Sequence, residues 1–326
     1  MGIKVLITGG LGFIGRNLIS YIDKNRVSKI IIIDNSKKID KKYFKKKSDI
    51  EIFSNKKQYK KNRKKINIIN ADVKDFNFAK EITKGIDFIV HLAAEPGVDL
   101  SVSQPYESFT TNVMGGYNYL EAGRINNIKN FIFASSGSVF GNCKPPMKRN
   151  YAKCPISPYG SSKLTVESFC STYSQVFNMN TTVLRFSNAY GKHSVHKQSV
   201  ISKFIKSYMN NKALTIYGDG KQTRDFVYVK DICSAIYKCF SNTKGYNEYH
   251  IGTGKETTLR NLLSYINVIF QSQDIKQPKV IFTKNRIGDM KNNSLYINDT
   301  KKILKWSPEY DLKKGLNETI NWYLNI

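Results

Sequence analysis

Two short motifs constrain the fold of this chain more than any other feature. The first is a glycine-rich run, TGGLGFIG at Thr8–Gly15, between an apolar segment and a segment with helical periodicity. The second is YGSSK at Tyr159–Lys163, near the middle of the chain. A strand, a glycine turn and a helix in this order can seat the diphosphate of a dinucleotide. A tyrosine and a lysine four residues apart share one helix face, where the lysine can help the tyrosine to take a proton from an alcohol.

Short β-branched runs alternate with longer amphipathic segments through the first half of the chain. The sequence predicts strands at Ile3–Thr8, Ile30–Asp34, Ile66–Asn70, Phe88–Ala93, Phe131–Ser135 and Thr182–Phe186. It predicts helices near residues 13–24, 75–84, 105–126 and 158–178. Continuous apolar strands separated by helices are typical of a parallel sheet that is covered on both faces. We therefore expect an α/β fold with a Rossmann-type doubly wound parallel sheet and right-handed crossovers.

The second half of the chain is more mixed. The pattern predicts helices at Val200–Asn211, Leu259–Phe270 and about Leu312–Leu324, with strands at Leu214–Tyr217 and Phe226–Val229. No linker rich in Pro, Gly or Ser divides the halves, so we expect them to pack directly and to form a cleft. We expect a dinucleotide-binding domain in residues 1–180, with segments near 226–250 returning to it. A smaller, mixed α/β substrate-binding region would lie mainly in residues 181–326.

The net charge is +27, and the densest positive run lies between Asn35 and Lys65, where 14 Lys or Arg residues stand against 3 Asp or Glu residues. We interpret this stretch as a solvated, partly mobile loop. The alternative is a positive field that attracts doubly charged nucleotide-sugars. Because no RNA- or DNA-binding motif accompanies the charge, nucleic-acid binding is the minor hypothesis.

Composition argues against two other classes of protein. No apolar run approaches the roughly 20 residues of a membrane-spanning helix. The first predicted strand runs directly into the glycine turn, without a signal-peptide pattern. The 5 cysteines form no CxxC pair and only 4 histidines are present. We therefore expect a reduced, cytoplasmic protein without membrane insertion and without a metal site.

The glycine run and the ends of the predicted strands form a candidate cofactor site. Gly9 permits a tight turn, Gly12 lets the backbone approach a diphosphate, and Gly15 allows close packing of the helix. Asp34 ends the second predicted strand, where its carboxylate can accept hydrogen bonds from both hydroxyls of an adenosine ribose. It would repel a 2′-phosphate, so the sequence predicts NAD rather than NADP. Asp72, after the third predicted strand, can bind the adenine amino group.

Three residues form a candidate catalytic group: Tyr159, Lys163 and Ser136. Tyrosine ordinarily titrates near pH 10, which makes it a poor base at neutral pH. The Lys163 ammonium and a positive nicotinamide ring would both stabilise the phenolate and lower the pKa of Tyr159. Ser136, just after the fifth predicted strand, can bind the reacting oxygen and relay its proton.

The order and chemistry of these motifs resemble those of extended short-chain dehydrogenases/reductases, in particular the NAD-dependent nucleotide-sugar epimerases and dehydratases. The resemblance covers nearly the whole chain. It implies an NAD site that contains Gly9, Gly12, Phe13, Ile14, Asp34, Asn35, Asp72, Val73, Leu92, Ala93, Ala94, Asn112, Tyr159, Lys163 and Phe186. It implies a substrate site that contains Ser136, Ser138, Tyr159, Asn188, Tyr217, Arg224, Arg286, Asp289 and Asn293.

The resemblance also assigns parts of the substrate to particular side chains. Asn188 would bind a phosphate, and Tyr217 would lie beside the nucleobase. Arg224 and Arg286 would clamp the diphosphate, since each offers bidentate donors to phosphate oxygens. Asp289 would meet the nucleotide ribose.

The choice of reaction depends on the two residues that follow Ser136. Dehydratases of the family resemble one another in an Asp-Glu pair at these positions, which acts on C5 and C6 of the sugar. Here the positions hold Gly137 and Ser138, which cannot serve as a comparable acid and base. We therefore expect a UDP-sugar 4-epimerase that works through a transient 4-keto sugar. The alternatives are a UDP-glucuronate 4-epimerase, a dehydratase with its acid elsewhere, a reductase, and a non-catalytic NAD-binding module.

Two finer expectations come from the same resemblance. A residue shortly after the Arg-x-Gly-Asp segment borders the C2 substituent of the sugar, and the matching position is Asn293. Asn is smaller than the Tyr that restricts the site to plain hexoses, so we expect UDP-N-acetylglucosamine to be accepted alongside UDP-glucose. The alternative is that Asn293 is a loop residue that points to solvent. The helices near 105–126 and 158–178 resemble a pair that forms a four-helix interface, which implies a homodimer.

Overall fold

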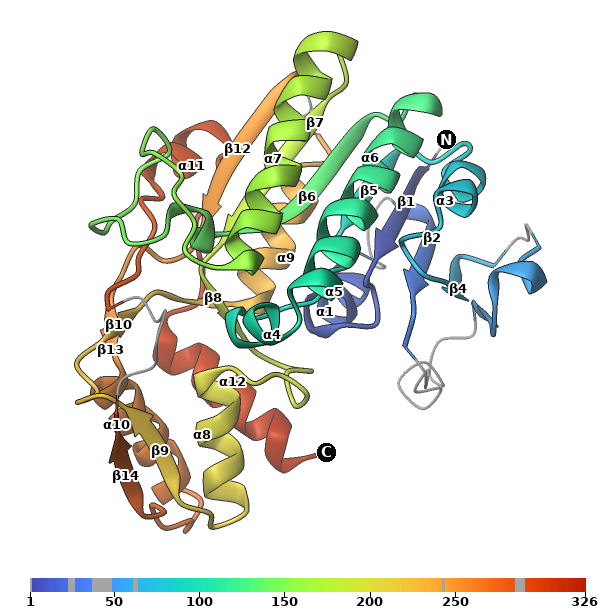
Figure 1. Ribbon diagram of the computed structural model, residues 1–326. Coiled ribbons are helices and arrows are strands. Elements are labelled where there is room, and N and C mark those ends of the chain that lie inside the picture. Colours follow the sequence, from blue (N-terminus) through green and yellow to red (C-terminus); the bar gives the residue numbers. More distant parts are fainter. Residues whose placement is uncertain (1, 23–26, 37–48, 61–63, 242–243, 285–290) are drawn as a thin grey trace.

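A computed structural model of the chain describes residues 2–22, 27–36, 49–60, 64–241, 244–284 and 291–326. Its centre is an eight-stranded, fully parallel sheet with the strand order β12-β7-β6-β5-β1-β2-β4-β3 (Figure 1). The strands are β1 (Ile3–Thr8), β2 (Val27–Asp34), β3 (Ile50–Phe53), β4 (Ile66–Asn70), β5 (Phe88–His91), β6 (Asn130–Ser136), β7 (Thr181–Phe186) and β12 (Tyr246–Ile251). The predicted doubly wound α/β fold is confirmed.

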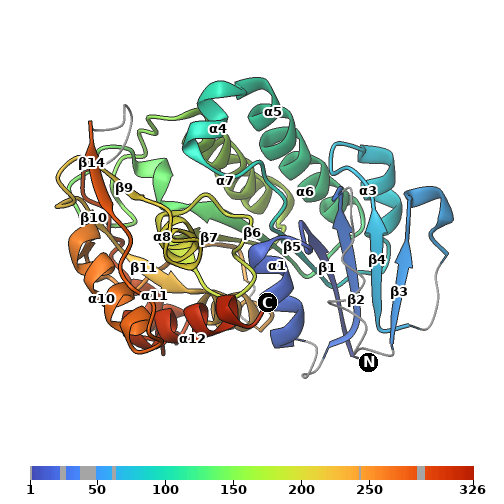
Figure 2. The same ribbon diagram turned by 90° about the horizontal axis from the view of Figure 1, so that it is seen from below.

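Helices cover both faces of this sheet, which explains why its central strands are apolar on both sides. In order along the chain, the helices are α1 (Phe13–Ile22), α3 (Phe76–Ile82), α4 (Val98–Ser103), α5 (Pro105–Phe109), α6 (Gly115–Ile125), α7 (Pro158–Phe177), α8 (Val200–Met209), α9 (Val229–Lys238), α10 (Leu259–Gln271), α11 (Asn298–Ile303) and α12 (Leu312–Leu324). Figures 1 and 2 show α6 and α7 on one face and α1 on the other. A π-helical turn, Thr110–Met114, links α5 to α6, so the segment predicted as one helix is continuous.

The remaining strands form three small two-stranded sheets. They pair β8 (Asn188–Tyr190) with β11 (Phe226–Tyr228), β9 (Leu214–Tyr217) with β14 (Val280–Thr283), and β10 (Thr223–Arg224) with β13 (Thr257–Thr258). Figure 2 shows β9 and β14 beside α8 and α10, away from the main sheet. One continuous apolar core runs from Leu18 in α1 through Val227 in β11 to Leu262 in α10. The two halves of the chain therefore pack directly on each other.

Two strands of the main sheet were not predicted as strands. β3 lies within the Lys-rich stretch that we interpreted as a loop, and a short 3₁₀ helix, Lys56–Gln58, follows it. That interpretation is wrong for residues 50–58, while residues 37–48 and 61–63 lie outside the described part. β12 pairs with β7, so a late segment does return to the sheet. The proposed domain boundary at residue 180 stays a prediction. Within the described residues, no helix is long and apolar enough to span a membrane.

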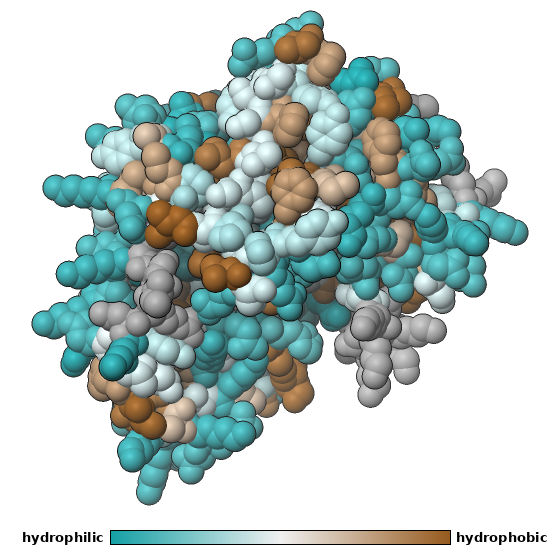
Figure 3. Space-filling model, in the orientation of Figure 1, coloured by the Kyte–Doolittle hydropathy of each residue, from teal (hydrophilic) through white to brown (hydrophobic). Residues whose placement is uncertain are grey.

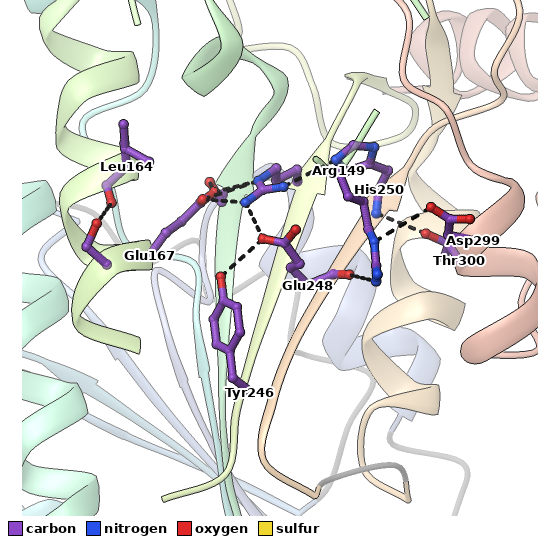
Figure 4. A network of polar contacts seen from close by, with 11 residues as sticks. Arg149, Leu164, Glu167, Tyr246, Glu248, His250, Asp299 and Thr300 are labelled. Carbon is purple, nitrogen blue, oxygen red and sulfur yellow. Dashed lines mark hydrogen bonds and ion pairs between the residues drawn. The ribbon is translucent and has the colours of Figure 1, made fainter. Parts of the chain in front are cut away.

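A buried network of charged side chains joins α7 to the sheet (Figure 4). At its centre is Arg185 on β7, whose side chain is fully buried. The guanidinium donates to both carboxylate oxygens of Glu167 on α7, with Nη2 2.7 Å from Oε2 and Nε 3.0 Å from Oε1. Nη2 also donates to Glu248 Oε2 on β12 at 2.6 Å. The Ser135 hydroxyl, at the end of β6, donates to Glu167 as well.

The network continues from Arg185 to His250 on β12. Burial, together with the positive charge of Arg185, lowers the pKa of His250 to about 3, so the imidazole is neutral. Its Nε2 lies 3.3 Å from Arg185 Nη1 and accepts a hydrogen bond, while Nδ1 donates to the Tyr296 carbonyl at 3.1 Å. Glu167 connects α7 directly to β6 and β7, and through Arg185 to β12. It sits one helical turn after Lys163.

We predict that Glu167→Ala lowers the free energy of unfolding by about 3 kcal/mol or more, because it leaves a buried guanidinium with one of its two carboxylate partners removed. Equilibrium denaturation in urea would measure the change. Glu81→Ala is the matched control, since the Glu81–Lys84 ion pair is exposed on the surface and its loss should not shift the midpoint measurably. An unshifted midpoint for Glu167→Ala would contradict this view of the network.

Candidate active site and cofactor cleft

The glycine run forms a tight turn between β1 and α1. Gly9 has φ +66°, and a Cβ on it would lie 2.7 Å from the backbone of Ala93, just after β5. Its N–H donates to the Ile33 carbonyl at 2.7 Å. A Cβ on Gly15 would lie 2.5 Å from Gly10 Cα, so the first turn of α1 packs against the glycine turn itself. Around Gly12, by contrast, a Cβ would meet only the Gly9 carbonyl at 3.2 Å, which leaves open space for a ligand.

Asp34, at the end of β2, holds this turn in place. Its Oδ2 accepts a hydrogen bond from the Leu11 N–H at 2.9 Å. Its Oδ1 accepts from the N–H and hydroxyl of Ser36, at 3.0 and 2.5 Å. Three of the four lone-pair sites of the carboxylate are thus occupied, and Oδ2 keeps one for a ribose hydroxyl. The residues of the turn therefore fit an adenosine dinucleotide, and Asp34 also has a structural role that the sequence did not reveal.

One large cleft, of about 1630 Å³, contains most of the predicted site residues. Typical small-molecule sites occupy roughly 300–1,000 Å³, so this cleft has room for a dinucleotide and a second ligand. The predicted residues that line it are Gly9, Gly12, Phe13, Ile14, Asp34, Asn35, Val73, Leu92, Ala93, Ala94, Ser136, Ser138, Tyr159, Lys163, Phe186, Asn188, Tyr217, Arg224 and Asn293. Arg286 and Asp289 lie outside the described residues.

Two predicted cofactor residues do not line the cleft. Asp72 accepts a hydrogen bond from the Lys74 N–H at 2.9 Å and so closes the turn after β4. Asn112 is buried, where it bonds the backbone of Glu95 and donates to the Ser162 hydroxyl at 3.0 Å. Asn112 therefore ties the segment after β5 to α7. A direct contact of either residue with the cofactor stays a prediction.

The start of α7 brings Tyr159 to the end of β6. Ser157 caps the helix by accepting a hydrogen bond from the Gly160 N–H at 3.1 Å, and Pro158 occupies the first turn. A Cβ on Gly160 would lie 2.7 Å from the Ser138 carbonyl, so the helix touches the backbone turn that carries Ser136. Ser136 in turn accepts a hydrogen bond from the Ser138 N–H at 3.2 Å. Sequence spacing alone could not place these two segments together.

The pKa of Tyr159 differs from the prediction that Lys163 would help to lower it. Burial raises the pKa of Tyr159, while a hydrogen bond with Ser136 lowers it, and burial has the larger effect. Lys163 does not offset the burial, because its Nζ donates to the Ala134 carbonyl at 2.9 Å and lies 5.8 Å from the Tyr159 ring centroid. Burial also lowers the pKa of Lys163 to about 8, against the charge of Glu167. The side chains of the protein alone therefore do not activate the tyrosine.

Two buried oxygen atoms lie unused near this group. The Ser138 hydroxyl and Asn293 Oδ1 have no hydrogen-bond partner among the described residues. Asn293 is 8% exposed, so it does not point to solvent. Its Oδ1 lies 3.9 Å from where a Cβ on Gly137 would be, which places it beside the turn after β6. Buried polar atoms without partners are candidates for ligand contacts.

The cleft also contains side chains that the sequence analysis missed. They come mainly from the segment between β8 and α8, and they include His193, His196 and Lys197. The signal that could have identified them is position, since this segment follows directly on Asn188. In the described parts of the chain, no group of three or more His, Cys, Asp and Glu side chains could hold a metal ion.

Known proteins are similar to this chain in fold and in sequence. The model of the NAD dependent epimerase/dehydratase family matches residues 5–252. dTDP-D-glucose 4,6-dehydratase of Homo sapiens is 31% identical over 336 residues, which cover 98% of this chain and 89% of the human protein. A solved structure of UDP-N-acetylglucosamine 4-epimerase from Methanobrevibacter ruminantium, in complex with UDP-N-acetylmuramic acid, has a TM-score of 0.87 and 28% identity, covering 100% and 99% of the two chains. UDP-glucose 4-epimerase of Thermotoga maritima, with UDP-glucose, has a TM-score of 0.87 and 26% identity, with 99% of each chain covered.

These similarities extend over nearly the whole chain and over both of its halves. They confirm the resemblance to extended short-chain dehydrogenases/reductases. The match to an NAD dependent family confirms NAD as the cofactor. The relatives include epimerases and a dehydratase, so the likeness does not by itself select one reaction. This chain belongs to the NAD-dependent epimerase/dehydratase family.

Proposed function

We propose that the protein is an NAD-dependent 4-epimerase of a UDP-hexose. The observation that carries the proposal is the composition of the turn after β6. Ser136 and Tyr159 approach each other there, yet the next two residues are Gly137 and Ser138. A dehydratase must also move protons at C5 and C6 of the sugar, which requires an acid and a base beside this group. Epimerisation requires only the reversible oxidation of one carbon.

The roles of the side chains follow from their positions. The bound NAD supplies the hydride acceptor and later the hydride donor. The Tyr159 phenolate takes the proton of the sugar C4 hydroxyl and becomes the neutral phenol, while Ser136 holds the same sugar oxygen through its hydroxyl. With a pKa of about 8, Lys163 stays mostly protonated at neutral pH, and its charge together with that of bound NAD would stabilise the phenolate before this step. The 4-keto sugar then turns over, and the Tyr159 proton returns to the C4 oxygen.

Other reactions of the family remain alternatives. A dehydratase or a reductase would leave a different product, and a UDP-glucuronate 4-epimerase would act on a sugar with an extra carboxylate. A non-catalytic NAD-binding module would convert no sugar at all. Incubation with a panel of UDP-hexoses, followed by NMR of the products, distinguishes these four alternatives from one another. Formation of the C4 epimer from a neutral UDP-hexose supports the proposal, and its absence contradicts it.

We predict that Tyr159→Phe lowers kcat by roughly 10²–10⁴, the usual contribution of a positioned general base. NAD content and nucleotide-sugar affinity should stay near those of the wild type, because the substitution removes only the hydroxyl. Steady-state kinetics and ligand titration measure the two effects. Ser136→Ala should act in the same direction, and near-normal turnover in Tyr159→Phe would remove the proposed mechanism.

The buried Asn293 supports a substrate with an N-acetyl group. Its amide is held beside Gly137, with Oδ1 unused by described residues. A side-chain amide can exchange hydrogen bonds with an acetamido group, and Asn leaves more room than Tyr would. We infer that UDP-N-acetylglucosamine is accepted alongside UDP-glucose.

We therefore predict that Asn293→Tyr lowers kcat/KM for UDP-N-acetylglucosamine by at least about tenfold more than for UDP-glucose, since the larger ring fills the space of the acetamido group. Asn292→Tyr is the control, because Asn292 is exposed and does not line the cleft. An equal loss on both sugars, or a wild type that ignores the N-acetylated sugar, would show that this view of the pocket is wrong.

An apolar surface over α5, α6 and α7 supports a homodimer. Figure 3 shows brown and tan residues over α6 and α7 on the face toward the viewer. The exposed large apolar side chains of these helices are Tyr106, Phe109, Tyr117, Ile125, Phe169, Val176 and Phe177. Tyr117 and Phe169 pack edge to face at 5.2 Å, which joins the two helices into one surface. Antiparallel pairing of this surface with its own copy would bury it.

We predict a sedimentation mass of twice the 37.3 kDa chain at micromolar concentration. Phe169→Asp should shift the protein toward the monomer, because it places a charge within the apolar surface. Val268→Asp introduces the same charge at an exposed position on α10 and should leave the dimer intact. A monomeric wild type would rule out the dimer.

A further inference from the structure

Lys197 contacts two segments of the cleft lining, one from each half of the chain. Its Nζ donates to the Ala189 carbonyl on β8 at 3.0 Å and lies 4.6 Å from the centroid of the Phe13 ring at the start of α1. Phe13 belongs to the turn predicted to hold the cofactor diphosphate. Ala189 follows Asn188, the residue predicted to bind a substrate phosphate. The ammonium group is therefore placed between two predicted phosphate positions.

The charge of Lys197 is not balanced by the described part of the protein. None of the described carboxylates is paired with its Nζ, and one carbonyl accepts one of its three N–H groups. Burial lowers the pKa of Lys197 to about 8, so the side chain is still mostly charged at neutral pH. A charged group that is largely removed from water normally has a partner of opposite charge.

Two further cationic side chains line the cleft, Arg16 on α1 and Lys203 on α8. His193 also lines it, but burial and the charge of Arg16 lower the pKa of its imidazole to about 4, so this side chain is neutral. The acidic residues that line the described cleft belong to other segments and are Asp34, Glu95 and Asp99. The part of the lining that carries Lys197 is therefore suited to an anionic ligand group.

We propose that Lys197 is a phosphate-binding residue, whose ammonium group donates to a diphosphate oxygen of a nucleotide in the cleft. Either NAD or the nucleotide-sugar can supply that diphosphate. This inference rests on the proposed function in one point, that a nucleotide-sugar is the second ligand that can supply the diphosphate. A charge-assisted hydrogen bond of this kind adds affinity for the diphosphate and none for the nucleoside.

The test compares the dissociation constants of UDP, uridine and NAD for four forms of the full chain, by isothermal titration calorimetry. Lys197→Met removes the charge at nearly constant volume, Lys197→Arg keeps it, and Lys206→Met makes the same charge change on α8 outside the cleft lining. We expect Lys197→Met to weaken UDP or NAD by about tenfold or more, the effect of one charged hydrogen bond. Lys197→Arg should restore most of the affinity, while Lys206→Met should bind like the wild type.

Each outcome decides the proposal. A loss for UDP but not for uridine identifies the nucleotide-sugar as the source, and a loss for NAD alone identifies the cofactor. Wild-type affinity of Lys197→Met for both diphosphates overturns the proposal, as does an equal loss for UDP and uridine. These are binding measurements without turnover. A protein that binds UDP through Lys197 but forms no C4 epimer would therefore contradict the proposed function and leave this inference intact.

Discussion

The geometry of the site depends on the ion pairs that the buried guanidinium of Arg185 forms with Glu167 and Glu248. An ion of this size loses several kcal/mol of hydration on burial unless carboxylates and hydrogen bonds surround it. Glu167 and Glu248 provide the carboxylates, and each comes from a different element of the fold. Their positions relative to β7 are therefore fixed together. An apolar contact would tolerate sliding of α7 along the sheet, whereas a two-point contact between a guanidinium and a carboxylate does not.

The consequence reaches the active site through two short covalent paths. Glu167 follows Lys163 by one helical turn on α7, and Ser135 precedes Ser136 at the end of β6. The hydrogen bond from Ser135 to Glu167 joins these paths. Tyr159 and Ser136 are thus held at a common position by groups that are themselves buried. Such support from neighbouring residues is what keeps a catalytic group in its productive geometry.

The sequence was sufficient for the parts of the site that depend on local chemistry. A glycine at positive φ, an acid at a strand end, and a Tyr and a Lys on one helix face can each be recognised from a few neighbouring residues. It was insufficient where a side chain acts over a long range. The second role of Asp34, which holds Leu11, spans 23 residues, and the approach of Gly160 to Ser138 depends on tertiary packing. β3 was not predicted because its four residues lie among many lysines. The high charge of the stretch indicated a loop, and the apolar run of β3 is too short to indicate a strand.

The choice among reactions depends on a small part of the site. Epimerases and a dehydratase are both similar to this chain over nearly its whole length, so the fold carries no information about the product. Our proposal therefore rests on the chemistry beside Ser136. In this chain the Ser138 hydroxyl and the amide oxygen of Asn293 lie there, both buried and both without partners among the described residues. Such groups can hold a sugar in place through hydrogen bonds, but they cannot exchange protons with carbon at neutral pH. Under the proposed function, such a site returns the hydride to the same carbon from which it was taken.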